Sequence, residues 1–502
     1  MQKIKFRNHI SIVAEQLGSI LLVALIFCVT VIAENLGDLR DADLSFLGQG
    51  AGMWIMAGCL AVLLLILGRS LLIWARTYIS IQENAIVIER DTLNKRKHTI
   101  GIKNISNINT EQNLFEMIVG TCKVKLDTNS LSTADKTDVK IVLKKQDAKA
   151  FCEQIEKMLR EYVGQSGQTE EKADEKVLRD SAYDITTDFA ALFVHGLFSV
   201  SPLSLLIVIG GAVGTATVIS EIFRDPNALE TALSVLASIL VAGAIFFSAL
   251  WDIIKGFVIY YGFRAKREGD KIYIRYGLLK KVEYTIPVDK IQALKINQSF
   301  FARLAGKYMA EIVNVGLDDE QENAKAFLLL YGTKEKLRGQ LAVLLPEFAD
   351  SAVTETERIP RRAWAAWLLP FGIFLLAAIV TGGYIGTWRP EYRTYVWMAV
   401  LALFILAVLC MILKYVTAGL RLEEDFLVIA RGYFGRRAVV IKYDKIQYIQ
   451  TSQNFIARVC GIEKGEVHLL ASATNRNQAL PYFKSGYTEA VKRKIVANPG
   501  QL

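Results

Sequence analysis

The hydrophobic positions of this chain gather in six long runs, which leave three long polar segments between and after them. The runs are Leu17–Ala33, Ala51–Trp74, Pro202–Ile219, Ala232–Trp251, Ala363–Gly382 and Tyr395–Leu413. Each is close to the roughly 17–25 residues that an α-helix needs to cross the hydrocarbon core of a bilayer. One such run is also typical of a buried helix in a soluble protein, but six favour membrane spans. The pattern predicts six transmembrane helices in three pairs.

The polar segments, Ala75–Leu192, Tyr260–Arg362 and Val416–Leu502, share a second pattern. The stretches "NAIVIERDTLNKRKHTIGI", "DKIYIRYGLLKKVEYTIPV" and "DFLVIARGYFGRRAVVIKY" each hold two β-rich runs around a basic turn. Alternation of apolar and polar residues in such runs indicates strands with one covered face. Each segment then ends in an amphipathic stretch, predicted as the helices Gln146–Tyr162, Lys334–Phe348 and Tyr487–Val496. Each unit is therefore predicted to be a small antiparallel sheet structure closed by one C-terminal helix.

A longer string repeats directly after the second β-rich run of each unit. It reads "VDKIQALKINQSFFARLAG" in the second unit, "YDKIQYIQTSQNFIARVCG" in the third and "IKNISNINTEQNLFEMIVG" in the first. The copies share an Ile, a Gln seven residues later and a Gly eight residues after that, and the last two share an Arg. These motif positions are Ile105, Gln112, Gly120, Ile291, Gln298, Arg303, Gly306, Ile446, Gln453, Arg458 and Gly461. We interpret them as mainly structural: the Ile faces a core, the Gly makes a turn, and the Gln and Arg bind backbone or dock onto the next unit.

Two apolar runs followed by "IPVDKIQALKINQSFFARLAG" resemble the bacterial membrane proteins with pleckstrin-homology (PH) domains, of the three-copy YdbT-like kind. The resemblance covers nearly the whole chain. It is strong in the second and third copies, whereas the first copy lacks the Asp-Lys pair and has Met117 in place of the Arg. The resemblance implies a partly open β-barrel of two packed sheets with a C-terminal helix in every unit. It also implies a bacterial inner-membrane protein without established enzymatic activity, often accompanied by a smaller single-copy relative.

These patterns together predict the domain organisation of the chain. In order, we expect a helix pair at 1–75, a PH-like domain at 76–163, a linker at 164–192, a helix pair at 193–259, a PH-like domain at 260–350, a linker and helix pair at 351–415, and a PH-like domain at 416–502. The expected fold class is thus membrane α-helical plus β.

Charge predicts the orientation of this architecture. The connector Glu34–Gly50 holds four acidic residues and one basic residue, and Ser220–Thr231 holds three and one, while the third connector is weakly basic. Basic residues gather instead at the other ends of the runs. Because short cytosolic segments are enriched in Lys and Arg, both termini and all three PH-like units are predicted to lie in the cytosol. The formal charge of +9 suits an anionic membrane surface.

No catalytic or metal-binding pattern emerges. The four histidines are scattered, and no phosphate-binding loop or nucleophile motif occurs. The Gly-rich stretch "SPLSLLIVIGGAVG" lies inside an apolar run and favours helix packing. We therefore expect no enzyme, cofactor or metal. Without zinc-ligand spacing or an RNA-binding signature, nucleic acid is not an expected partner either.

The basic turns are the remaining candidates for a binding site. A cation recurs ten residues before the motif Ile in every unit, and the turns could contact anionic lipid headgroups. The residues are Lys95, Arg96, Lys97, Lys280, Lys281, Arg436 and Arg437. A solvated hairpin turn is the alternative interpretation.

Repetition without catalytic residues favours a docking function. Linked weak sites give avidity that no single site has, so we expect a platform for protein assembly, with a role in envelope maintenance or defence. The expected partners are membrane lipids, copies of the same chain and a smaller single-copy PH relative. The alternative hypothesis is a transporter or lipid-handling protein regulated by its PH-like units.

Overall fold

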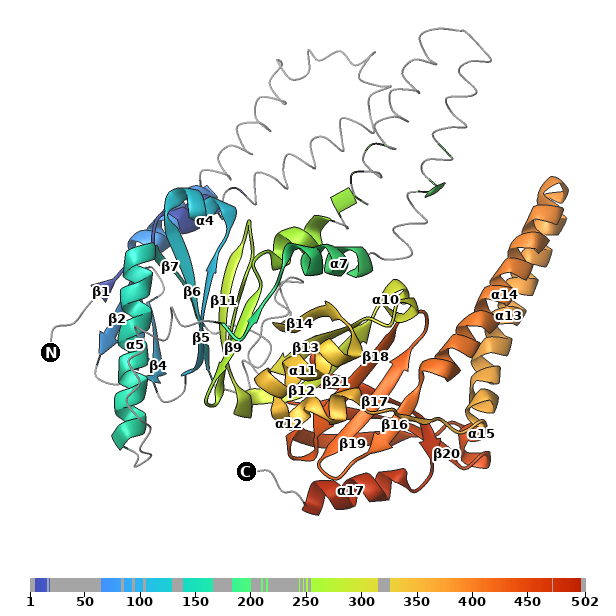
Figure 1. Cartoon of the computed structure of the whole chain (residues 1–502). Coiled ribbons are helices and arrows are strands. Elements are labelled where there is room, and N and C mark those ends of the chain that lie inside the picture. Colours follow the sequence, from blue (N-terminus) through green and yellow to red (C-terminus); the bar gives the residue numbers. More distant parts are fainter. Residues whose placement is uncertain are drawn as a thin grey trace, which may run out of the picture. The chain divides into compact units, whose positions relative to one another are not determined.

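The structure is a computed structural model. It describes residues 5–15, 18, 65–82, 85–92, 95–102, 105–128, 139–165, 183–199, 254–314, 326–471 and 473–497, with a few isolated positions between 209 and 251. The chain divides into a first unit (residues 1–129, 138–180 and 280–282) and a second unit (130–137, 181–279 and 283–502). Figure 1 traces both units in the colours of the sequence.

The first unit contains one PH-like repeat made of two antiparallel groups of strands and a long helix. One sheet has the order β1-β2-β3-β4, and a second group has the order β7-β6-β5. The strands are β1 (Lys5–Phe6), β2 (Thr77–Gln82), β3 (Ala85–Arg90), β4 (Arg96–Gly101), β5 (Ile105–Gln112), β6 (Thr121–Thr128) and β7 (Val139–Lys144), and the helices are α4 (Leu114–Val119) and α5 (Lys145–Gln165). Ile86 of β3, Val124 of β6 and Phe151 of α5 are fully buried in one core. The shared core makes this repeat a two-layered β-structure closed by α5.

The second unit contains the other two repeats. Its strands lie in the orders β11-β10-β9-β8, β14-β13-β12-β18-β17-β16-β15 and β19-β20-β21. They are β8 (Ile185–Thr186), β9 (Arg264–Glu268), β10 (Lys271–Tyr276), β11 (Lys281–Pro287), β12 (Ile291–Gln298), β13 (Tyr308–Asn314), β14 (Ala326–Gly332), β15 (Glu357–Arg358), β16 (Gly419–Leu422), β17 (Phe426–Gly432), β18 (Arg436–Lys442), β19 (Ile446–Ser452), β20 (Ile462–Leu469) and β21 (Asn477–Lys484). Each repeat thus supplies one set of strands before the motif Ile and another set after it.

The helices of the second unit connect and close these sheets. They are α7 (Phe189–Ser199), α10 (Phe300–Leu304), α11 (Lys334–Leu344), α12 (Pro346–Ala349), α13 (Ala363–Trp388), α14 (Arg393–Thr417), α15 (Phe455–Val459), α16 (Ala473–Arg476) and α17 (Tyr487–Ala497), with short 3-10 turns η4 (Val288–Lys290), η5 (Ser351–Val353), η6 (Pro390–Tyr392) and η7 (Tyr443–Lys445). Helices α5, α11 and α17 lie where the sequence predicts amphipathic helices. The predicted helix Lys334–Phe348 is divided into α11 and α12, because a residue that precedes a proline, here Leu345 before Pro346, avoids the helical conformation.

The second and third repeats are joined by direct strand pairing. Strand β12 of the second repeat pairs antiparallel with β18 of the third, from Ala293 opposite Ile441 to Gln298 opposite Arg436. On its other side β12 pairs with β13. A single sheet therefore runs through both repeats (Figure 1).

The expectation of six membrane-spanning helices in three pairs is contradicted. Within the described residues only two helical segments, Ala363–Trp388 and Pro390–Thr417, are long and apolar enough to cross a membrane. The described helices Leu65–Ala75 and Phe189–Ser199 are apolar but shorter than 18 residues. The expected spans Leu17–Ala33 and Pro202–Ile219, most of Ala51–Trp74 and most of Ala232–Trp251 lie outside the described residues.

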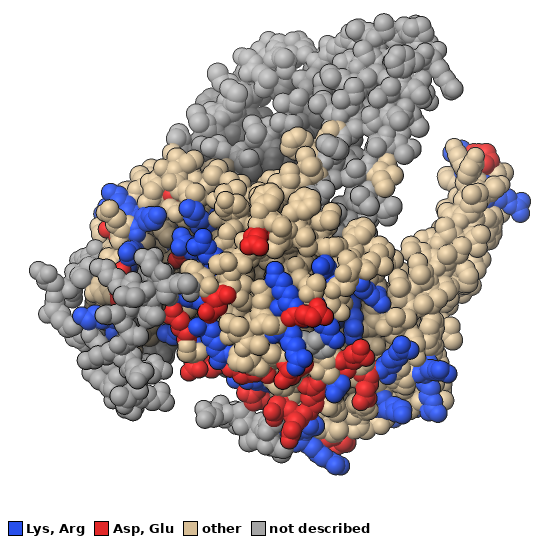
Figure 2. All heavy atoms as spheres, in the orientation of Figure 1, with Lys and Arg blue, Asp and Glu red and all other residues tan. Residues whose placement is uncertain are grey.

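The two long helices form a hairpin with an exposed apolar surface. Helix α13 has 26 residues and α14 has 25, or about 38 Å each. Only 17% of the most apolar window of the first segment and none of the second is buried. Figure 2 shows the hairpin without charged side chains between its tip and its base. A surface of this composition is suited to lipid rather than to water.

Candidate functional site

The motif Gln makes the same hydrogen bond in all three repeats. The side-chain Nε2 of Gln112 donates to Thr121 O at 2.7 Å, that of Gln298 to Lys307 O at 3.1 Å and that of Gln453 to Ile462 O at 3.1 Å. Each acceptor lies nine residues further along, at the start of the next strand. The Gln therefore ties the two ends of the short helical connection together.

The short helix inside each connection is capped in the same way. Asn113, Ser299 and Asn454 each accept a hydrogen bond at the N-terminus of α4, α10 and α15. Gly120, Gly306 and Gly461 have φ angles of 76°, 62° and 64°, in the left-handed region that favours glycine. Ile105, Ile291 and Ile446 are buried. These contacts give the shared string a structural role in every copy.

The motif Arg has different surroundings in the two copies that carry it. Arg303 Nη1 lies 3.4 Å from Tyr433 O and 3.5 Å from Phe434 O, in the basic turn of the following repeat. The ring of Phe300 packs edge-on against Phe434, with centroids 5.9 Å apart. Arg458 of the third repeat is exposed. Arg303 thus belongs to a contact between repeats as well as to its own turn.

The basic turns are in three different environments. Lys95 and Lys97 form exposed ion pairs with Asp91 at 3.1 Å and Glu89 at 3.2 Å, and Arg96 beside them is exposed. Lys281 is exposed, whereas Lys280 lies 3.1 Å from Glu111. Arg436 and Arg437 line a cavity in the second unit. The structure therefore does not gather the seven cations into one kind of site.

The second unit contains a cavity lined by several cations. Its volume is about 780 Å³, and it lies between the joined second and third repeats and the base of the α13–α14 hairpin. Its lining residues are Asn297, Gln298, Ser299, Met309, Glu311, Tyr331, Trp367, Lys414, Ala418, Arg431, Gly432, Tyr433, Gly435, Arg436, Arg437, Lys464, Ala479, Leu480, Pro481 and Tyr482. The turn at its edge needs glycine, because a Cβ on Gly435 would lie 2.5 Å from Gln298 O. We call it the basic cavity.

The charge of the basic cavity is strongly one-sided. Lys414, Arg431, Arg436, Arg437 and Lys464 face it, against the single acid Glu311. Burial, aided by the nearby Arg437, lowers the pKa of Arg431 from its ordinary value. Burial also lowers the pKa of Arg436, and Arg303 acts in the same direction. Burial is the main cause of both pKa shifts; Arg437 and Arg303 add to it, whereas Glu466 and Glu355 oppose it.

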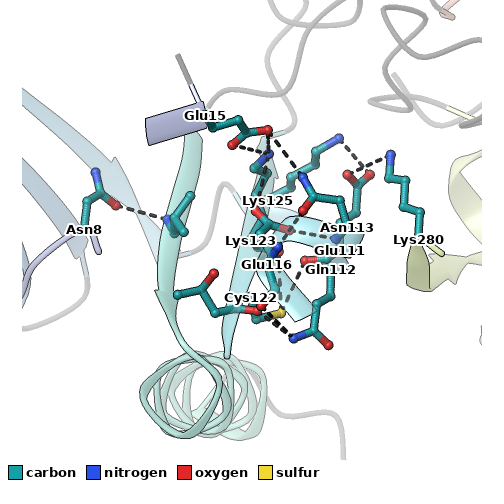
Figure 3. Close-up of polar contacts among 12 residues, drawn as sticks. Asn8, Glu15, Glu111, Gln112, Asn113, Glu116, Cys122, Lys123, Lys125 and Lys280 are labelled. Carbon is teal, nitrogen blue, oxygen red and sulfur yellow. Dashed lines mark hydrogen bonds and ion pairs between the residues drawn. The ribbon is translucent and has the colours of Figure 1, made fainter. Parts of the chain in front are cut away.

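A second polar cluster is buried in the first unit (Figure 3). Lys125 and Glu111 form an ion pair at 2.8 Å, with 4% and 3% of their side chains exposed. Burial opposes ionisation of Glu111, but Lys125 and Lys280 overcome it and hold the pKa of this carboxyl below its ordinary value. Burial raises the pKa of Glu116, although Asn113 and Lys123 oppose the rise.

The same cluster holds the N-terminal helix against the sheet. Lys123 Nζ lies 3.2 Å from Glu15 and 3.5 Å from Glu116. Asn8 Oδ1 accepts a hydrogen bond from the backbone N–H of Val142. The cluster therefore positions the segment that precedes the first apolar run. Among the residues that the structure describes, no group of His, Cys, Asp or Glu side chains is arranged to hold a metal ion.

Repeated two-layered β-structures with a closing helix, beside a long exposed apolar helix pair, define a membrane protein with PH-like domains. The model of the bacterial PH domain family matches residues 19–159, 204–341 and 369–498. The chain belongs to this family, and its three matched stretches confirm the three-copy resemblance.

One relative matches the chain over most of its length. The UPF0699 transmembrane protein YdbT of Bacillus subtilis (strain 168) is 22% identical over 427 residues, which cover 81% of this chain and 81% of the relative. No solved structure matches the chain significantly.

Proposed function

We propose that this membrane protein is a non-enzymatic assembly platform, and that its PH-like repeats join to further copies by pairing of strand edges. The observation that supports this proposal is the difference between β12 and β19, which occupy the same position in successive repeats. Strand β12 is buried along most of its length between β13 and β18. Strand β19 lies at the end of its sheet among the described strands, and five of its seven residues are exposed.

The aromatic side chains next to β12 are covered, whereas those of β19 and next to it are exposed. Phe300 follows β12 and packs on Phe434 of the next repeat. Its counterpart Phe455 follows β19 and is 81% exposed. Tyr448, within β19, is 56% exposed. An open strand edge beside exposed aromatic side chains is a template for pairing with another chain.

The strand that would cover β19 is one equivalent to β18. Strand β4 has this position in the first repeat; it ends its own sheet among the described strands, and Arg96 to Thr99 are exposed. The pairing of β12 with β18 supplies the register. In that pairing Ile296 is opposite Ala438. Thr451 has the same position in the third repeat as Ile296 in the second, and Lys97 has the same position in the first repeat as Ala438 in the third. The same register therefore puts Thr451 of one copy opposite Lys97 of another. Such a head-to-tail contact builds a ring or an open row of copies.

We place this assembly at the bacterial inner membrane, with the PH-like repeats in the cytosol. The charge asymmetry of the connectors and the basic residues near the base of the apolar helices support this orientation. Lateral assembly of this kind suits a role in envelope maintenance or defence, and it requires no reaction chemistry.

Cysteine crosslinking in isolated membranes, with copper phenanthroline added as the oxidant, tests the proposal. Two differently tagged full-length copies are co-expressed, one with Thr451→Cys and the other with Lys97→Cys. Antiparallel strand neighbours have Cα atoms about 4.5–5.5 Å apart, within the range of a disulfide. We expect a disulfide-linked heterodimer that carries both tags, and a ladder of larger species when one chain carries both substitutions.

Matched controls define the register. His98→Cys replaces Lys97→Cys in one control, because a shift of one residue turns the side chain to the opposite face of the sheet. The parent chain, without added cysteines, controls for Cys460 and the other native thiols. Efficient crosslinking of Thr451→Cys to itself, or equal crosslinking in both registers, would refute this pairing. If a smaller PH protein is captured by Thr451→Cys instead, the platform role stands but the partner is not a second copy.

A further inference from the structure

The basic cavity carries an inference that the assembly function does not use. It is built wholly within the second unit from the membrane-proximal ends of α13 and α14 and from strands of the second and third repeats. Lys414 lies in the last turn of α14, and Trp367 lies near the start of α13. If the hairpin crosses a bilayer, the cavity is therefore at the level of its base.

The cations of the cavity have neutral partners. Arg437 Nε donates to Asn297 Oδ1 at 2.9 Å, and Arg436 Nη2 donates to Thr356 Oγ1 at 3.0 Å. Lys414 Nζ stands 4.7 Å from the centre of the Trp367 ring, a cation–π contact. Glu311 lines the cavity with the five cations, and Glu466 and Glu355 act electrostatically on Arg431 and Arg436.

A buried donor in this group has no partner in the structure. Arg436 Nε is buried and has no hydrogen-bond acceptor. A buried donor without an acceptor is destabilising, and more so when it is charged. Arg431 and Arg437 are directly opposite each other on β17 and β18, so their forked guanidinium groups share one face of the sheet, and forked donors match the oxygens of a phosphate group.

Part of the cavity lining is apolar. Met309, Trp367 and Tyr482 are more than nine-tenths buried, and Leu480 and Pro481 lie beside them in the lining. Free phosphate makes no use of such a lining, but the glycerol and the first acyl carbons of a lipid do. Cations, apolar lining residues and the base of an apolar hairpin together favour a ligand that has both a phosphate group and an apolar part.

We propose that the basic cavity binds the phosphate group of an anionic amphiphile, with the bridging phosphate of an anionic phospholipid held by Arg431, Arg437 and Lys464. The apolar part of the ligand lies along Trp367 and Tyr482. The group that the cavity recognises is a phosphate anion, which a soluble phosphate compound could supply as well as a lipid. Binding would strengthen the join between the repeats, since the cavity is lined from both β12 and β18.

Lipid binding by the full-length protein tests this inference. The protein is reconstituted in nanodiscs of phosphatidylcholine with increasing fractions of phosphatidylglycerol, and lipid retained after mild detergent extraction is counted by native mass spectrometry. The double variant Arg431→Gln with Lys464→Gln removes two cavity cations and leaves the hydrogen-bonded Arg436 and Arg437 in place. We expect its retention of phosphatidylglycerol to fall at least tenfold.

The control variant removes the same charge from the same repeat but outside the cavity. Lys484→Gln with Arg493→Gln alters two exposed cations that do not line it, and retention should change less than twofold. Hydrogen exchange of β17 and β18 in both variants checks that the sheet is intact. Crosslinking between Thr451→Cys and Lys97→Cys is measured in parallel, so failure of lipid binding and failure of strand pairing are seen separately.

Inorganic phosphate distinguishes the two sources. If it does not displace phosphatidylglycerol at millimolar concentration, the ligand is a lipid. Displacement by phosphate, with the same loss in the cavity variant, supports the phosphate site with a soluble ligand. Equal retention of phosphatidylglycerol and phosphatidylcholine, or equal loss in the cavity and control variants, would overturn the proposal.

Discussion

The buried ion pair of Glu111 and Lys125 allows a quantitative test of the first unit. Both side chains are at most 4% exposed, and their charged atoms are 2.8 Å apart. Replacing Lys125 by Met leaves the carboxylate of Glu111 buried. Removal of one partner from a buried pair typically costs 3–5 kcal/mol. We expect about 3 kcal/mol, at the lower end, because Lys280 remains 3.1 Å from Glu111.

Full-length protein in detergent is suited to this measurement. Native-state hydrogen exchange of β6 at pH 7 reports the free energy of local opening in the first unit. The double variant Glu111→Met with Lys125→Met should lie within about 1 kcal/mol of the parent, because an apolar pair often replaces a buried ion pair without loss. Lys97→Met, which breaks the exposed pair with Glu89, should cost less than about 1 kcal/mol.

The sign of the pH effect is also fixed. Because the folded pKa of Glu111 is below its ordinary value of 4.5, its contribution is complete above that value and is lost as the pH falls through the folded pKa. The reasoning is refuted if Lys125→Met costs no more than Lys97→Met. It is equally refuted if the double variant is less stable than Lys125→Met alone.

Three further predictions concern the second unit. Burial lowers the pKa of His195 to about 3, and its neutral Nδ1 accepts a hydrogen bond from the backbone N–H of Tyr331. Because the folded protein disfavours the protonated imidazole, the packing of α7 on β14 should lose stability as the pH falls from 6.5 towards 3, by about 2 kcal/mol at pH 5. Hydrogen exchange of β14 measures this loss, and the variant His195→Gln should not show it. A Cβ at Gly306 would contact nothing within 4 Å, but the φ angle of this residue is 62°, so Gly306→Ala should destabilise α10 by about 1–2 kcal/mol, measured by hydrogen exchange. Gly339 in α11 also has open space around it, and Gly339→Ala should not destabilise that helix. Equal effects of the two variants would contradict the argument from backbone strain. Asn454→Ala removes the 2.7 Å hydrogen bond to Ala457 N and should cost about 1 kcal/mol in exchange of α15, while Asn454→Asp should retain most of it.

Much of each repeat could be predicted because the relevant contacts are local. The apolar alternation predicted strands, and the amphipathic stretches predicted α5, α11 and α17. The hydrogen bond from Gln298 to Lys307 O spans nine residues within one connection, so the repeated string indicated its structural role. Two of the expected spans coincide with α13 and α14, but hydropathy alone led to six, a number that the described structure does not support.

The basic turns show where sequence reasoning reached its limit. Seven cations looked equivalent because each follows the same strand in its repeat. In the structure Lys95 and Lys97 pair with acids of their own hairpin, whereas Arg436 and Arg437 line the basic cavity. Arg437 meets Asn297 only because β18 lies beside β12, 140 residues away in sequence at this contact.

The sequence by itself determined the repeated unit, its strands and helices, and the apolar hairpin, because hydrophobic periodicity and turn chemistry act over a few residues. Tertiary structure decided which strand edges are covered and which cations face one another. Strand pairing uses backbone N–H and C=O groups that every residue type except proline supplies, so the pairing of β12 with β18 leaves no distinctive pattern in the sequence. The basic cavity follows from that pairing, since residues of both strands line it.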